Sequence, residues 1–251
     1  LIHFLIAMGH RYIREGRMHL STYALNDCLK AEDYAKLDLR QLRDAIQKAG
    51  IDQADQSVAY FLLQSNYDDA LDRLAPEHVW PFFAEQPDFL AEALGLLPSQ
   101  LHGYYESYNV AAALQILGYF PQLPTQFIPR LLELALGESK SYRLQAQQLL
   151  QRLPDIRLRA EEGLASSKQE IRIVAAEWLV RLNDVAAIAA LQTALKKEKR
   201  EVVIAALLTA LEKLGEDISA HLSPEHLLKD AEKGLKAKLP TSLKWLLDQS
   251  F

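Results

Sequence analysis

The chain has 251 residues, of which 49% are hydrophobic and 24% charged, and its 10 Gly and 10 Pro are thinly spread. This composition excludes a disordered chain, and the dominance of residues that lose least on entering a helix predicts an all-α fold. The net charge of −5 argues against a nucleic-acid-binding function for the whole chain. The charge is uneven, because residues 1–138 carry 10 Lys and Arg against 18 Asp and Glu, whereas residues 139–251 carry 18 against 15.

The beginning of the sequence indicates neither a membrane span nor a signal peptide. Residues 1–8 are apolar except for His3, but a spanning helix needs about 20 such residues. A signal peptide carries its positive charge before the apolar run, whereas Arg11 and Arg14 follow it. We therefore expect no membrane segment and a cytoplasmic location. The chain starts within a helical pattern and without an initiator Met, so we expect a fragment of a longer protein.

The single cysteine, Cys28, cannot form a disulfide within the chain, which fits a reducing compartment. It lies in an amphipathic stretch and is predicted to be a small buried hydrophobe rather than a reactive thiol.

Residues 1–107 show helical patterning without a clean repeat, and we expect irregular helical pairs that continue or cap a solenoid. The pattern predicts helices over 39–49 (ending at Gly50), 56–64 and 68–74, and Pro76 is suited to the first turn of another. An aromatic patch follows, consisting of Trp80, Phe82, Phe83 and Phe89. Such a patch predicts core, with a partner groove as the alternative.

The second half contains an internal repeat, which is the strongest signal in the sequence. Segments 142–155, 171–184 and 203–216 align with apolar or small residues at matching positions. Those positions recur at i, i+4, i+8 and i+11, the stripe of an amphipathic helix. Each copy ends in a helix-stop residue followed by an acid, namely Pro154-Asp155, Asn183-Asp184 and Gly215-Glu216. A weaker copy upstream contains Val110, Leu114 and Leu117 before Gly118.

Each copy continues into a second predicted helix, at 126–136, 156–165, 185–195 and 224–235. Asp155 and Asp184 stand where the N-cap of this helix belongs. The unit is therefore helix, tight turn, helix, with a period near 30 residues. Because one such pair cannot bury its apolar stripe alone, the copies are expected to stack.

The copy at 171–184 resembles the HEAT family of helical repeats, whose first helix reads roughly V-R-x-x-A-A-x-A-L-x-x-L-G-D. The matching residues are Ile171, Arg172, Ala175, Ala176, Leu179, Leu182 and Asp184. Trp178 replaces a small residue and Asn183 replaces glycine. The resemblance covers residues 108–237 and implies a right-handed α-solenoid that binds partners along a concave face.

A second resemblance lies at residues 238–251, a capping segment or the start of a following region. Residues 238–248 are similar to the segment that closes the helical region in bacterial WGR-domain proteins of the molybdate metabolism regulator kind. This resemblance implies a regulatory protein whose flanking domains lie outside this chain.

No pattern in the sequence predicts catalysis, a cofactor or a metal. The seven histidines are scattered without ligand spacing, and no phosphate-binding or nucleophile-elbow motif occurs. One catalytic alternative comes from the family, since some bacterial HEAT-like proteins are alkylpurine DNA glycosylases that use Trp, Asp and Arg. Here Trp178, Asp184 and Arg181 are near one another in sequence, but Trp178 falls on the packing stripe. We therefore predict a non-enzyme.

Two groups of residues are candidates for partner binding. The first lies on second helices, which in HEAT-like proteins tend to face the concave surface, and comprises Arg130, Arg157, Arg159 and Gln192. Intramolecular pairing with Glu133, Glu161 or Glu162 is the alternative for the arginines. The second is a ladder of inter-repeat loop cations, comprising Lys140, Lys168, Lys196, Lys197, Lys199 and Arg200. Such a ladder suits an acidic partner or a phosphate backbone, and a solvated loop run is the plainer interpretation.

These observations predict a protein-interaction scaffold whose partner is another protein. A nucleic-acid-binding module is the alternative, and its support is the lysine ladder.

Overall fold

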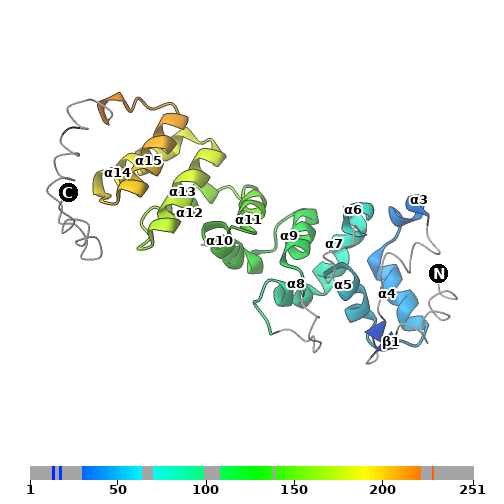
Figure 1. The fold of residues 1–251 in the computed structure, drawn as a ribbon. Helices are drawn as coiled ribbons and strands as arrows, with labels where there is room; N and C mark the ends of the chain where they lie inside the picture. The colour runs from blue at the N-terminus through cyan, green and yellow to red at the C-terminus, as the bar shows by residue number, and fades with distance from the viewer. Residues whose placement is uncertain are drawn as a thin grey trace, which may run out of the picture. The chain divides into compact units, whose positions relative to one another are not determined.

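The computed structural model describes residues 13–14, 17–18, 30–63, 70–98, 108–137, 140–221 and 228. These residues are organised almost wholly as helices joined by turns, which confirms the all-α prediction (Figure 1). The exception is a two-stranded antiparallel ladder, in which β1 (Ile13–Arg14) pairs with β2 (Arg17–Met18). None of the described helices combines the length and apolar character that crossing a bilayer requires. The chain divides into two compact units, residues 1–156 and 157–251.

The first unit is a series of short helices. They are α3 (Ala31–Tyr34), α4 (Leu39–Lys48), α5 (Ala54–Leu63), α6 (Ala70–Arg73), α7 (Pro76–Glu85), α8 (Pro87–Ala93), α9 (Val110–Tyr119), the 3-10 turn η1 (Thr125–Phe127), α10 (Ile128–Leu136) and α11 (Arg143–Leu150). Their ends follow local sequence signals. Asp38 caps α4 by accepting the N–H groups of Arg40 at 2.9 Å and Gln41 at 3.2 Å. Gly50 follows α4 with φ +82°, and Pro76 occupies the first turn of α7 as predicted.

The aromatic patch contributes two residues to the core of this unit. Phe82 and Phe83 are fully buried and pack edge to face, with ring centroids 5.1 Å apart. Trp80 and Phe89 are only half-buried, and the Trp80 ring lies 5.8 Å from the ring of Phe120. The core prediction therefore holds for the two residues that α7 directs inward.

The second unit contains the clearest repeat copies. Its elements are α12 (Ile156–Gly163), which begins one residue before the unit boundary, α13 (Gln169–Leu182), η2 (Val185–Ala187), α14 (Ile188–Lys197), α15 (Glu201–Lys213) and η3 (Ser219–His221). After α13, Asn183 adopts the left-handed conformation with φ 52°. Asp184 then accepts the N–H of Ala186 at 2.9 Å, which confirms the predicted stop and N-cap.

The predicted first helix of copy 142–155 is shorter than expected, because α11 ends at Leu150 and turns occupy the residues up to Asp155. Pro154 disfavours helical conformation in the residue before it, which accounts for the early end. The predicted second helices at 126–136 and 185–195 both begin as a 3-10 turn before continuing as α10 and α14. Of the predicted helix at 224–235 the structure describes only Leu228, which is helical and exposed, and the segment 238–251 and Cys28 lie outside the described residues.

Helix packing follows one scheme in both units. In the first unit α11 packs against α9 and α10, and in the second α15 packs against α13 and α14. The first helices α11 and α15 thus each contact both helices of the preceding copy. A second recurrence is the arginine at the start of a first helix. Arg143 donates to the carbonyl of Gly137 at 2.7 Å and Arg172 to that of Ser166 at 2.8 Å, each six residues upstream. Both arginines satisfy carbonyl groups where the preceding second helix ends.

Candidate partner-binding groove

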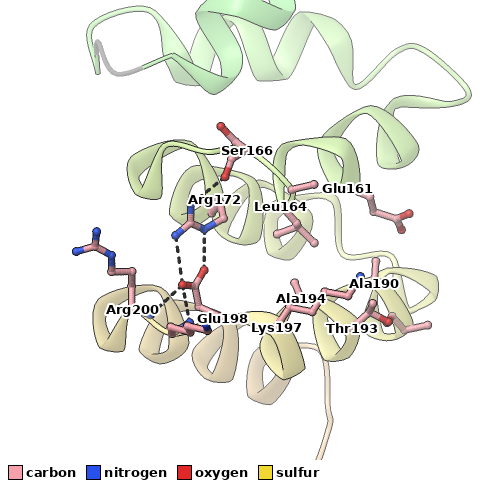
Figure 2. Close-up of a pocket in the computed structure, with 13 residues that line it drawn as sticks. Glu161, Leu164, Ser166, Arg172, Ala190, Thr193, Ala194, Lys197, Glu198 and Arg200 are labelled. Atoms are coloured by element: carbon pink, nitrogen blue, oxygen red, sulfur yellow. Dashed lines mark hydrogen bonds and ion pairs between the residues drawn. The ribbon is translucent and has the colours of Figure 1, made fainter. Parts of the chain in front are cut away.

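An open groove of about 790 Å³ lies between α12 and α14 in the second unit (Figure 2). One wall is formed by Glu161 of α12 and by residues 164–166, which follow the end of that helix. The other wall is formed by α14, and Arg172 of α13 and residues 198–200 line one end. α12 and α14 coincide with the predicted second helices of two consecutive sequence copies, so the groove lies between these copies.

The α14 wall is made of small side chains. Ala189, Ala190, Thr193 and Ala194 line the groove, and the pairs 189/193, 190/193 and 190/194 are three or four residues apart, the spacing of one helix face. Ala189 and Thr193 are exposed, whereas Ala190 and Ala194 are half-buried. The Thr193 hydroxyl donates to the carbonyl of Ala189 at 2.8 Å, so it is already satisfied within the helix. Small side chains at a helix surface allow a partner to approach the backbone closely.

An ion pair between Arg172 and Glu198 fixes one end of the groove. Arg172 donates through Nε to Oε2 at 2.7 Å and through Nη2 to Oε1 at 3.2 Å, a bidentate geometry. The two side chains are only 15% and 8% exposed. Oε1 of Glu198 also accepts the backbone N–H groups of Lys199 at 2.8 Å and Arg200 at 2.9 Å. Burial alone would raise the pKa of Glu198, but these hydrogen bonds outweigh it and hold the pKa below its ordinary value.

Three cations stand around the junction of α14 and α15. Lys197, Lys199 and Arg200 line the groove and are exposed, and none forms an ion pair within the described part of the chain. The carboxylate of Glu198 is already compensated by Arg172, so it does not neutralise them. The Arg172 end of the groove is therefore positively charged.

The structure corrects the predicted location of this basic run. Lys196 and Lys197 form the last turn of α14, Glu198 is its C-cap and Arg200 is the N-cap of α15, so the run is not simply a loop. Lysines are favourable in a last helical turn because they complement the partial negative charge of the helix C-terminus. Lys196 is exposed but does not line the groove.

The second-helix candidates lie on the helices predicted for them but are engaged within the chain. Arg130, on α10, donates to the carbonyl of Leu94 and to Glu133, both at 2.8 Å. Arg159, on α12, pairs with Glu162 at 3.3 Å. Neither residue lines the groove. The intramolecular alternative therefore describes both arginines.

Arg157 and Gln192 connect consecutive copies. Arg157 pairs with Glu161 and also with Asp184 at 2.9 Å, and the Glu161 hydrogen bond is the main reason that its pKa is raised. Gln192 donates to Glu216 at 2.5 Å. Asp184 and Glu216 are the acids that follow the stop residues, so each accepts from the second helix of the preceding copy. These two residues also lie outside the groove lining.

The remaining candidates do not contribute to the groove. Lys168 is the N-cap residue of α13, and Lys140 lies just before α11 in the first unit. Their alignment with Lys196 along one edge stays a prediction. Trp178 is 1% exposed, so it is a core residue that cannot stack on an extruded base as it stands. Among the residues described, no cluster of His, Cys, Asp or Glu is arranged to hold a metal ion.

Sequence reasoning identified Lys197, Lys199 and Arg200 but missed the rest of the groove. The signal for Arg172 and Glu198 was present, since Glu198 is the single acid in a basic run and Arg172 belongs to the repeat motif.

No family model matches the chain, and no curated protein or solved structure is significantly similar to it.

Proposed function

We propose that this chain is a HEAT-like, right-handed solenoid segment that acts as a non-catalytic protein-interaction scaffold within a larger intracellular protein. The observation that carries the proposal is the groove between α12 and α14, which combines small side chains with cations that no acid of the described chain neutralises. Small, open helical surfaces bordered by charge are suited to a protein segment, because it supplies both apolar contacts and charged groups.

The repeated contacts support the stacking that a solenoid requires. Arg157 reaches Asp184 of the next copy, and Gln192 reaches Glu216 of the copy after that. Stacking is also supported by two recurrent features, namely the carbonyl contacts of Arg143 and Arg172 and the packing that α11 and α15 share. Stacked copies place their second helices side by side, and the interhelical grooves then form an extended binding surface.

Nucleic-acid binding is the second candidate, favoured by the exposed Lys197, Lys199 and Arg200. Binding to a phosphate backbone grows with the number of phosphates neutralised, and stable complexes commonly use about 6–10 such contacts. Among the described residues, the cations that line the groove without an acidic partner are Lys197, Lys199 and Arg200, which is fewer than such a complex uses, and the whole chain has a net charge of −5. The protein partner is therefore the better supported of the two.

An affinity pull-down with the full chain from cytosolic lysate, with and without nuclease, tests the proposal. A Thr193→Trp variant fills the groove from an exposed position, and Lys196→Trp introduces the same side chain on α14 outside the groove. We expect proteins that survive nuclease, are lost with Thr193→Trp and are retained with Lys196→Trp. Capture that disappears with nuclease, or that is indifferent to Thr193→Trp, would contradict the scaffold proposal.

A further inference from the structure

We propose that the groove between α12 and α14 binds an acidic peptide segment, with its carboxylates against Lys197, Lys199 and Arg200 and its small apolar side chains against Ala190 and Ala194. This inference rests on the proposed scaffold function and specifies the chemistry of the partner. It follows from three properties of the groove, namely its size, its charge distribution and the chemistry of its walls.

The size of the groove suits a short peptide segment. Its volume of 790 Å³ falls within the range of about 300–1,000 Å³ that is typical of ligand-binding clefts. The walls consist of helices and turns, and no described lining residue belongs to a β-strand, so the groove offers no free strand edge. Recognition must therefore come from side chains, which makes the identity of the lining residues decisive.

The charge distribution selects an anionic group at one end. Figure 2 shows Arg172, Glu198 and Arg200 at one end of the groove, with Glu161 near Ala190 and Thr193 at the other. Both acids are compensated, Glu198 by Arg172 and Glu161 by Arg157. The Glu161 end is thus close to neutral, whereas Lys197, Lys199 and Arg200 stand around the junction of α14 and α15 and have no ion-pair partner among the described residues. A ligand that matches this pattern carries acidic groups at one end only.

The walls favour a peptide over a nucleic acid. A nucleic acid strand carries phosphates along its whole length, and single strands are held by aromatic platforms on which the bases stack. None of the described lining residues is aromatic, so the groove offers no stacking platform. The alanine and threonine side chains instead match small or branched apolar side chains at van der Waals distance.

Panning a displayed library of random short peptides against the full chain tests this inference. We expect the enriched peptides to share Asp or Glu residues next to small apolar residues. A synthetic copy of an enriched peptide, measured by fluorescence anisotropy, should bind about fivefold more weakly to Lys197→Glu, since reversing one exposed charge at a binding rim is worth roughly 1 kcal/mol. Binding should also weaken as ionic strength rises.

Lys196→Glu is the matched control, because it makes the same charge change at the adjacent position, which is exposed but outside the groove. Its affinity should stay close to that of the unmodified chain. The inference is overturned if no peptide is enriched, if the enriched peptides lack acidic residues, or if the two variants weaken binding equally. A single-stranded oligonucleotide that displaces the peptide in a Lys197-dependent manner would also overturn it. Protein capture that is sensitive to Thr193→Trp would still uphold the scaffold proposal in each of these cases.

Discussion

Replacing Arg172 by methionine tests how consecutive copies are held together beneath the groove. The Arg172 guanidinium donates four hydrogen bonds, two to Glu198 and two to the carbonyls of Ser166 and Ser167. These bonds join the residues after α12 to the residues after α14. Methionine retains an apolar stem of similar length, so the change removes the charged group while preserving most of the packing.

The expected cost follows from what Glu198 loses. Removing one partner of a fully buried ion pair costs about 3–5 kcal/mol, because the remaining charge is left uncompensated. Glu198 is 8% exposed and keeps its hydrogen bonds from the N–H groups of Lys199 and Arg200. We therefore expect the low end of that range, about 3 kcal/mol of unfolding free energy. Adding Glu198→Gln removes the uncompensated charge, so the double variant should be about 1–2 kcal/mol more stable than the sum of the single effects.

Urea-induced unfolding of the full chain measures both quantities. The two compact units can unfold in separate transitions, so the signal should come from the second unit alone. Replacing Trp80 and Trp245 by phenylalanine leaves Trp178 as the single tryptophan, and its fluorescence then reports on α13. The reasoning is refuted if Arg172→Met changes the unfolding free energy by less than about 1 kcal/mol and the two substitutions are additive.

Three further predictions concern the same unit. The folded-state pKa of Glu198 lies below its ordinary value of 4.5, so the stabilising contribution of its carboxylate is present above pH 4.5 and is lost as the pH falls through the folded-state pKa. Measurements of the unfolding free energy at decreasing pH should show this loss of stability in the unmodified chain and a smaller loss in Glu198→Gln. Trp178→Ala should destabilise the chain by about 3–5 kcal/mol in urea unfolding, because it removes a side chain that is 1% exposed, and a near-neutral effect would contradict its core role. Asn183→Ala should cost about 1–2 kcal/mol, because the position has φ 52°, whereas Asn183→Gly should cost nothing in the same measurement.

Much of the local structure could be predicted because short-range signals determine it. The stop and cap at Asn183-Asp184, the end of α4 at Gly50 and the start of α7 at Pro76 all agree with the sequence interpretation. These features depend on backbone conformation and on hydrogen bonds between near neighbours, which residue identity largely fixes. The short α11 shows the limit, since the apolar stripe continued to Leu153 while the helix ended at Leu150.

The groove could not be predicted in full, because it depends on pairings between residues far apart in sequence. Periodicity placed Arg157 and Gln192 correctly on second helices but did not reveal that each pairs with an acid of the next copy. Likewise, the basic run identified Lys197 but could not show that Lys196 points outside the groove lining. Such choices depend on helix packing, which sequence spacing alone does not specify.

The most direct test of the central claim, that the α12–α14 groove is the partner-binding surface, is site-specific photocrosslinking in cell lysate. A photoreactive residue at Thr193 lies in the groove, and one at Glu177 occupies an exposed position on α13 outside it. We predict that Thr193 crosslinks to a discrete protein and that Glu177 does not. Equal crosslinking at both positions, or crosslinks at Thr193 to nucleic acid, would contradict the account.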